Sequence, residues 1–446
     1  MLSVLANRIY RHLICAQIIA LIGTGLATVA LGLLAYDLAG ANAGAVLGTA
    51  LAIKMVAYIG VAPVVGAYAD RLPRRAFLVA MDVVRAAVAF MLPFVDQIWQ
   101  IYLLIFVLQS ASAAFTPTFQ ATIPDVLPDE SDYTKALSLS RLAYDLESLL
   151  SPILAAAALS IISFHWLFTC TSIGFLASAL FVLSVSLPTS PAIERVGGIY
   201  ARTTRGLRIY LKTPRLKGLL ALTLAAAAAS SMVIVNTIVI VRDQLGFGQS
   251  AVALTLASYG GGSMLAALLL PRLLDRLSDR SVMIAAACAL AAGLAIMAAL
   301  TTLLQHFGIF WHIVLASWFL LGVAYSASVT PSGRLLRRSA NADDRPAVFA
   351  AQFALSHCCW LIAYPLAGQI GAGYGQAVAF GTLAILAGLG VVTALTIWPA
   401  NESGAVPHSH DDLPPDHPHL REGHGNTRSA EHDFVIDNLH TVWPRQ

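Results

Sequence analysis

The sequence predicts an all-α integral membrane protein: twelve transmembrane helices in two pseudo-symmetric six-helix bundles, followed by a disordered cytoplasmic tail. Three observations lead to this fold class. Hydrophobic residues make up 58% of the chain and charged residues only 11%, against about 25% charged in soluble proteins. The mean hydropathy is +0.73. The apolar residues fall in runs of roughly 20, the length that crosses a hydrocarbon core of about 30 Å. A water-soluble enzyme is thereby excluded.

The apolar runs predict the individual spans. Helices are expected because backbone amides in lipid must be hydrogen-bonded within the segment, and the runs are too long for barrel strands. The first run has no small-residue cleavage site and leads directly into the second, so we interpret it as a retained helix. The spans are 13–36, 43–68, 77–95, 97–121, 137–163, 165–187, 217–241, 250–270, 281–303, 309–331, 347–371 and 375–398.

Basic residues predict the orientation. Almost all of the 27 Lys and Arg fall in the N-terminus, the even-numbered loops and the tail, whereas the opposite loops hold only Arg242. Short loops rich in Lys and Arg stay in the cytoplasm. We therefore expect a multi-pass protein of the bacterial inner membrane with both termini cytoplasmic.

A polar segment predicts the division into halves. The predicted units are a six-helix bundle at 1–187, a basic cytoplasmic linker at 188–216, a second bundle at 217–398 and a His-rich tail at 399–446. Arg residues three and four apart would form a basic stripe on one helix face of the linker. That stripe suits anionic lipid headgroups, and a solvated linker is the alternative.

The two halves repeat each other. The segment ADRLPRR at 69–75, after the second span, is echoed by LDRLSDR at 274–280, after the eighth. Thr-Pro pairs end the fourth and tenth spans at 116–117 and 330–331. Parallel halves of this kind indicate a substrate site at their interface near mid-membrane, reached by rocking one half against the other.

The segment GAYADRLPRR at 66–75 resembles the signature loop of the major facilitator superfamily, and the resemblance covers residues 1 to about 399. In that family the Asp and Arg of this loop hold the cytoplasmic ends of the halves together in one state of the cycle. The resemblance implies that role for the following residues: Asp70, Arg71 and Arg75, with Asp275 and Arg276 as weaker counterparts.

Two further family patterns match in part. Phe106 stands where the family often has a proton-coupling Arg. Glu147 stands where the Gly-rich stretch of the antiporters has a Gly, so a carboxylate there departs from a typical drug antiporter.

Charges inside the spans are candidates for transport or proton coupling, because each costs at least about 2.5 to 3.5 kcal/mol in lipid. Arg141 and Asp145 lie four apart and can neutralise each other. Glu147 lies about 200° round the helix from Asp145, so only one is expected to face the substrate, and we favour Glu147. Lys54 is either paired with an acid on another helix or neutral.

Other polar residues in the spans are weaker candidates. Asp82 and Arg85, three apart, are expected to form a structural pair. Consecutive helical residues point about 100° apart, so His357, Cys358 and Cys359 cannot all bind one ion. Packing is the alternative role for each. The remaining cavity candidates are His312, Asn236 and Gln17.

The tail changes composition abruptly. Seven of the twelve His fall between 408 and 440. Imidazole beside carboxylate suits Ni(II), Co(II) or Zn(II), and a merely solvating tail is the alternative. Phe434, Ile436 and Trp443 suggest a short anchor. The expected metal ligands are His408, His410, Asp411, Asp412, Asp416, His417, His419, His424, His432 and His440.

A His-rich tail on such a transporter resembles the bacterial nickel-resistance permeases of the superfamily. The resemblance implies an exporter of a divalent metal, nickel first and cobalt or zinc next. No GxxxxGK[ST] motif is present, so the energy is expected to come from an ion gradient rather than a nucleotide. Exchange for protons is the expected form of this secondary active transport. The alternatives are an efflux pump for drug-like molecules or metal chelates, and a membrane-tethered metal buffer. The expected partners are the lipid bilayer, the metal ion and protons. No enzymatic activity, resident cofactor or nucleic acid is expected.

Overall fold

The computed structural model describes residues 2–68, 73–187, 199–305, 307–341, 344–400, 405–409, 429–437, 440 and 443. Within these ranges some side chains stay undescribed, among them those of Arg141 and Asp145.

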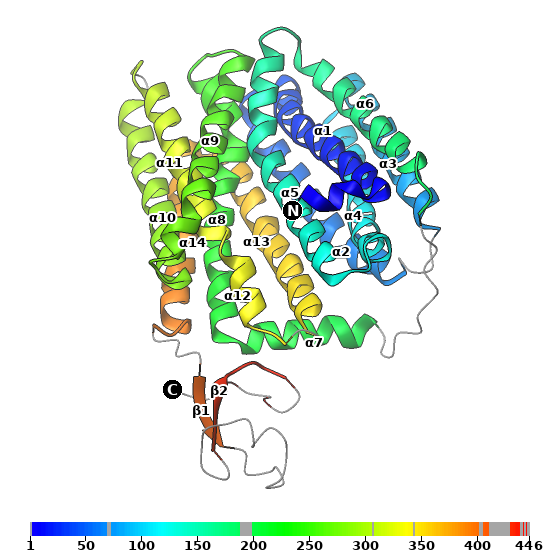
Figure 1. The fold of residues 1–446 in the computed structure, drawn as a ribbon. Helices are drawn as coiled ribbons and strands as arrows, with labels where there is room; N and C mark the ends of the chain where they lie inside the picture. Colours follow the sequence, from blue (N-terminus) through cyan, green and yellow to red (C-terminus); the bar gives the residue numbers. More distant parts are fainter. Residues whose placement is uncertain are drawn as a thin grey trace.

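The N-terminal half contains the first six long helices, drawn blue to teal in Figure 1. Its elements are η1 (Leu2–Ala6), α1 (Arg8–Ala39), η2 (Gly40–Asn42), α2 (Ala43–Tyr68), α3 (Arg74–Met91), η4 (Leu92–Phe94), α4 (Ile98–Val126), α5 (Glu130–Leu159) and α6 (Phe164–Leu183).

The C-terminal half lies beside it and is drawn green to orange (Figure 1). Its elements, after the linker helix α7 (Ile199–Lys212), are α8 (Pro214–Ile238), η5 (Val239–Gln244), α9 (Gln249–Leu274), α10 (Asp279–Leu304), α11 (Phe310–Val329), α12 (Ser332–Arg338), α13 (Arg345–Tyr374) and α14 (Gln376–Ile397).

The helix ends follow from local chemistry. Asn7 accepts hydrogen bonds from the amides of Ile9 and Tyr10 and so begins α1. Asp129 begins α5 and Ser278 begins α10 in the same way. Gly375, at φ +88°, makes the turn between α13 and α14, a backbone conformation that suits glycine.

The predicted spans agree with the long helices. The described residues form twelve helices of 18 residues or more, one for each predicted span. Ten stretches of the described chain are long and apolar enough to cross a membrane; one of them, Arg8–Ala62, contains α1 and most of α2, and α5 is not among them. The protein is thus a multi-pass membrane protein with the predicted all-helical core.

The linker contains a helix, as the Arg spacing suggested, but α7 packs on protein. Gly206 lies directly against the backbone of Ala347 on α13. The guanidinium of Arg205 donates to Asp344 at 2.9 Å. Burial raises the pKa of Tyr210, so its hydroxyl stays protonated and donates to Gln352. One face of α7 is therefore bound to the C-terminal half.

The helix bundle has two ends, which lie opposite each other along the helix axes. The start of α1 lies beside the end of α4, because Asn7 donates to the carbonyl of Val126. This end, where α7 and the tail also lie, is called the tail end. The opposite end, with the connections at 40–42, 160–163 and 245–248, is called the far end.

The halves meet closely at the far end. A Cβ on Gly48 of α2 would lie 2.5 Å from the carbonyl oxygen of Tyr364 on α13. Gly44 and Gly368 approach backbone to backbone one turn further on. Ser250 of α9 donates to the carbonyl of Leu159 on α5 at 3.3 Å. Small residues allow these helices to pack without intervening side chains.

The described part of the tail contains a hairpin, which the expectation of a disordered tail did not include. Strands β1 (Ala405–Ser409) and β2 (Ser429–Asp433) pair antiparallel. Phe434 and Ile436 are buried in the main hydrophobic core and Trp443 packs against it, as the suggested anchor requires. A polar composition favours disorder, but a few apolar side chains, Phe434 and Ile436 among them, hold this segment against the core.

Candidate functional site

Two aromatic rings connect the halves in the middle parts of α2 and α13. His357 of α13 stacks on Tyr58 of α2, with ring centres 5.2 Å apart and planes 8° apart. Its Nδ1 lies 2.6 Å from the carbonyl oxygen of Phe353. Because a carbonyl only accepts, Nδ1 carries the hydrogen, and Nε2 of the neutral ring keeps a lone pair for a proton or a metal.

Lys54 lies one helical turn before Tyr58, with its ammonium 5.9 Å from the centre of that ring. The ammonium attracts the carboxylate of Glu147 on α5. Among the side chains that the structure describes, none forms an ion pair with either group within 4.0 Å. The two groups thus interact electrostatically without forming an ion pair.

Glu147 is positioned by the close packing of α5 on α1. Gly25 has no side chain, and a Cβ there would collide with the hydroxyl of Ser151 and lie 3.2 Å from Oε1 of Glu147. Glu147 is partly exposed. A glycine opposite the carboxylate therefore leaves space around it.

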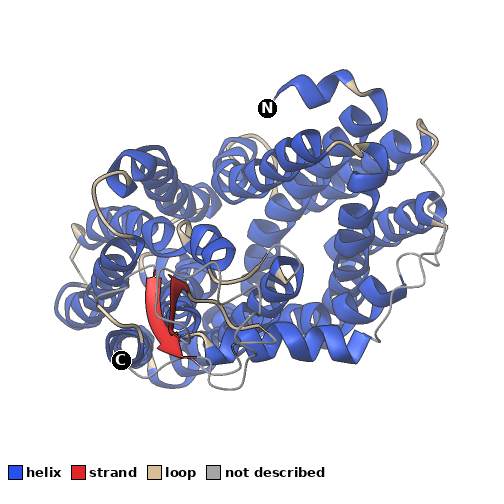
Figure 2. Cartoon of the chain, turned by 60° about the horizontal axis from the view of Figure 1, so that its bottom comes forward, coloured by secondary structure: helices blue, strands red, loops and turns tan. Residues whose placement is uncertain are grey.

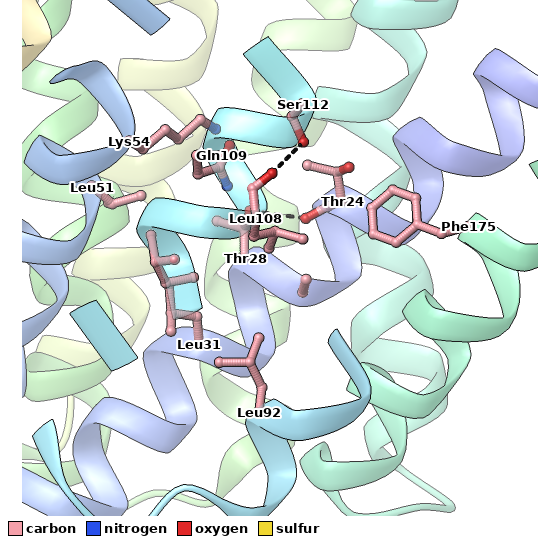
Figure 3. Close-up of a pocket in the computed structure, with 12 residues that line it drawn as sticks. Thr24, Thr28, Leu31, Leu51, Lys54, Leu92, Leu108, Gln109, Ser112 and Phe175 are labelled. Carbon is pink, nitrogen blue, oxygen red and sulfur yellow. Dashed lines mark hydrogen bonds between the residues drawn. The ribbon is translucent and has the colours of Figure 1, made fainter. Parts of the chain in front are cut away.

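Lys54 also borders a small cavity inside the N-terminal half (Figure 3). The volume is about 20 Å³, enough for about one water molecule. Three hydroxyls that line the cavity, those of Thr24, Thr28 and Ser112, donate their hydrogens to carbonyls of their own helices. Their oxygens can therefore only accept hydrogen bonds from a group in the cavity. Oε1 of Gln109 is buried without a partner in the described chain. The cavity therefore offers hydrogen-bond acceptors to an ammonium.

The structure separates the other cavity candidates from this cluster. Asn236 is buried and donates to the carbonyl of Ala367 at 2.9 Å, next to Gly44, so it belongs to the far-end contact between the halves. His312 is exposed near the start of α11. Cys359 packs against Ala227 and Ala363, and Cys358 is partly exposed beside it. Gln17 is buried in α1 with Oε1 unpaired among the described residues.

Of the predicted gating residues, Arg75, Asp275 and Arg276 are described, and they lie at the tail end. Asp70 and Arg71 fall outside the described residues. Arg75 donates to the carbonyl of Leu183. Asp275 and Arg276 are exposed, and no ion pair involving them appears in the described parts of the chain.

Two neighbouring residues, missed by the sequence analysis, make the ion pairs instead. Arg74 pairs with Asp125 at the end of α4. Asp279 lies 3.5 Å from Arg334 and 4.0 Å from Arg338. In the N-terminal half a cation at the start of α3 pairs with an acid at the end of α4. In the C-terminal half an acid at the start of α10 pairs with two cations of the short helix α12. The signal in the sequence was their place beside the loop, directly at a helix start.

Asp82 and Arg85 form the predicted structural pair. Ser178 donates to Asp82 at 2.7 Å. The guanidinium of Arg85 lies 4.3 Å from the ring centre of Phe115 and 4.5 Å from that of Phe175. All of these groups come from α3, α4 and α6, so the pair lies within one half.

Most predicted metal ligands of the tail fall outside the described residues or have undescribed side chains. Among the described side chains no three of His, Cys, Asp and Glu gather as a metal site. His440 is described and buried, with Nδ1 3.0 Å from Asp437.

The two six-helix halves, with polar and charged groups between and within them at half depth, have the architecture of a membrane transporter. The family model of the Major Facilitator Superfamily matches residues 13–236 and 219–429, and the chain belongs to that family.

Known relatives agree with this family. The chain is 23% identical over 394 residues to the uncharacterized MFS-type transporter YvqJ of Bacillus subtilis, covering 84% of this chain and 89% of that one. Macrolide efflux protein A of Enterococcus faecalis is 24% identical over 152 residues, 32% of this chain and 47% of that protein.

Solved structures share the fold. The nucleoside transporter NupG has a TM-score of 0.66 at 14% identity, covering 87% of this chain and 98% of that chain. The D-xylose-proton symporter has a TM-score of 0.64 at 15% identity, covering 87% and 97%.

Proposed function

We propose that this secondary transporter exports a divalent transition metal, nickel first and cobalt or zinc next, from the bacterial cytoplasm in exchange for protons. The observation that carries the proposal is the cluster of Glu147, Lys54 and His357, in which groups able to hold protons or cations meet from both halves.

Charge balance supports cation exchange at this cluster. In the empty site the ammonium of Lys54 balances the carboxylate of Glu147. An entering cation competes with that ammonium for the same carboxylate. When displaced, the ammonium has the acceptors of Gln109 and its neighbouring hydroxyls within the cavity that Lys54 borders. Nε2 of His357 adds a nitrogen ligand of the kind that nickel, cobalt and zinc prefer.

The membrane potential favours proton exchange. Moving one charge against 100 mV costs about 2.3 kcal/mol, so a divalent cation leaving a negative interior costs about twice that. Exchange for two protons makes the step electrically neutral. Protons on the groups of the cluster and the metal ion would occupy the site in turn.

The tail supports a metal cargo. The Cα register of the hairpin pairs Val406 with His432 and His408 with Ala430. The two histidines, far apart in sequence, thus stand at diagonal positions about 7–8 Å apart. With both termini in the cytoplasm, as the basic loops predict, the tail would collect metal on the side from which it is exported.

A second candidate is efflux of a drug-like cation. The similarity to macrolide efflux protein A favours it, as does the lack of a three-ligand metal group among the described side chains. The same carboxylate would then receive an organic ammonium.

Flux in proteoliposomes tests the proposal. With a pH gradient imposed, we expect Ni²⁺ to move against the protons, and E147Q and H357Q to slow it at least tenfold. His312→Gln is the matched control, because that histidine is exposed and lies elsewhere. If the protein transports a cationic dye but not Ni²⁺, the second candidate, efflux of a drug-like cation, is established. A shortened chain that ends at Pro399 should retain Ni²⁺ flux, because the helices carry the transport site. If the wild-type protein binds Ni²⁺ but does not transport it, the protein is a membrane-tethered metal buffer.

A further inference from the structure

The end of the chain is docked on the C-terminal half. Residues 434–443 are called the docking segment; of these, 434–437, 440 and 443 are described. Phe434 is 4% exposed, Ile436 2% and His440 4%. Figures 1 and 2 place the adjoining hairpin beneath the C-terminal half. Three of the described side chains of this segment, Phe434, Ile436 and His440, are thus buried.

The docking segment has its own internal structure. Oδ1 of Asp437 accepts from the amide of His440 at 2.7 Å, and the amide of Asp437 donates to the carbonyl of His440 at 3.1 Å. The ring of Phe434 lies 4.7 Å from that of His440 and 5.1 Å from that of Trp443. These contacts hold three rings together as one compact unit.

Arg215, at the start of α8, is the main contact for this unit. Its Nε donates to Ser339 and a terminal nitrogen to the carbonyl of Arg338, both at 2.8 Å. The guanidinium carbon of Arg215 also lies 5.4 Å from the ring centre of Trp443, within the range of a cation–π contact. One cation therefore joins the end of α12 to the tail.

The connection between α12 and α13 joins the tail to the linker. Asn341 in this connection donates to Asp437 of the docking segment at 3.5 Å. Asp344, three residues later, binds Arg205 of α7. The tail and the linker thus meet on one short piece of chain.

We propose that the surface around Arg215 and Asn341 is a specific docking site whose occupant is the chain's own segment 434–443. Docking fixes the tail to the C-terminal half, so that the histidine-bearing hairpin moves with that half and stays at the tail end. The inference does not depend on the cargo.

A disulfide tests the docked geometry in the full-length chain. N341C and D437C together should cross-link under mild oxidation, and each single variant should not. In W443A the yield should fall at least tenfold. The exposed Trp99 provides the control: adding W99A to the double-cysteine chain should leave the yield of the cross-link unchanged.

Proteolysis and a peptide supply independent readouts. W443A should speed protease cleavage of the tail at least tenfold, and a fluorescent peptide of residues 429–446 should bind W443A but not the wild type, whose site is filled. Cross-linking that is absent, or unchanged by W443A, would overturn the proposal. If W443A does not fold, the double-cysteine chain alone still decides, because the absence of its disulfide contradicts docking.

Discussion

Gly48 of α2 packs directly on the backbone of Tyr364 in α13, and a Cβ there would lie 2.5 Å from the carbonyl oxygen. This contact joins the two halves at the far end. Under the alternating access that the proposed exchange requires, this contact separates in the other state, so its tightness affects the balance between the two states.

Gly48→Val should therefore favour the state with the far end open. A clash of about 1.4 kcal/mol shifts the populations about tenfold. Spin labels at the exposed residues Asn42 and Gln244, one in each half, should report a longer distance. Gly60→Val is the control on the same helix, since nothing lies within 4 Å of its Cβ position. Equal distances in both variants would refute this.

Gly25→Ala should disturb the site. The added methyl collides with Ser151 and approaches Oε1 of Glu147 at 3.2 Å, so transport should fall at least about tenfold, a change of about 1.4 kcal/mol in the barrier. Gly23→Ala, two residues away, meets its nearest atom at 3.5 Å and should be tolerated. Similar flux in both variants would show that α1 and α5 do not position the carboxylate.

Asp82→Ala should lower the stability of the N-terminal half by about 3–5 kcal/mol, because it leaves the buried Arg85 uncompensated. The double variant D82A/R85M should be more stable than D82A alone. Thermal unfolding in detergent measures both. A double variant that loses the sum of the two single effects would mean that the pair does not interact.

Asp279→Asn should weaken the tail end of the C-terminal half by about 1 kcal/mol, because Arg334 and Arg338 are both solvent-exposed. Asp275→Asn, at the exposed residue of the loop motif, should leave stability unchanged. The free energies of unfolding of the two variants, measured by denaturation, show which of the two aspartates stabilises this end: Asp279, which forms the ion pairs in the structure, or Asp275, which the motif implies. The reverse order of effects would favour the motif.

The sequence predicted the helices well because lipid thickness dictates their length. The largest difference lies at α5, which begins at Glu130 rather than 137. Its polar first turns follow the Asp129 cap, and no hydropathy pattern reveals them. The hairpin and α12 were not expected at all, since each depends on tertiary contacts such as those of Phe434 and Arg215.

The site was only partly predictable. Composition marked Lys54 and Glu147 as unusual, but it could not show that they interact, because their proximity depends on helix rotation and on the space left by Gly25. The stacking of His357 on Tyr58 is likewise a contact between halves. The ion pair of Arg74 joins α3 to Asp125 at the end of α4, a contact that no spacing within the loop motif indicates.

Proton movement driven by nickel tests the account most directly. Vesicles containing the protein and a pH-sensitive dye receive a Ni²⁺ gradient with no initial pH difference. We predict that protons flow opposite to Ni²⁺ in the wild type and that E147Q abolishes this flow. Nickel flux without any pH change, or the same pH change in E147Q, would contradict exchange at this site.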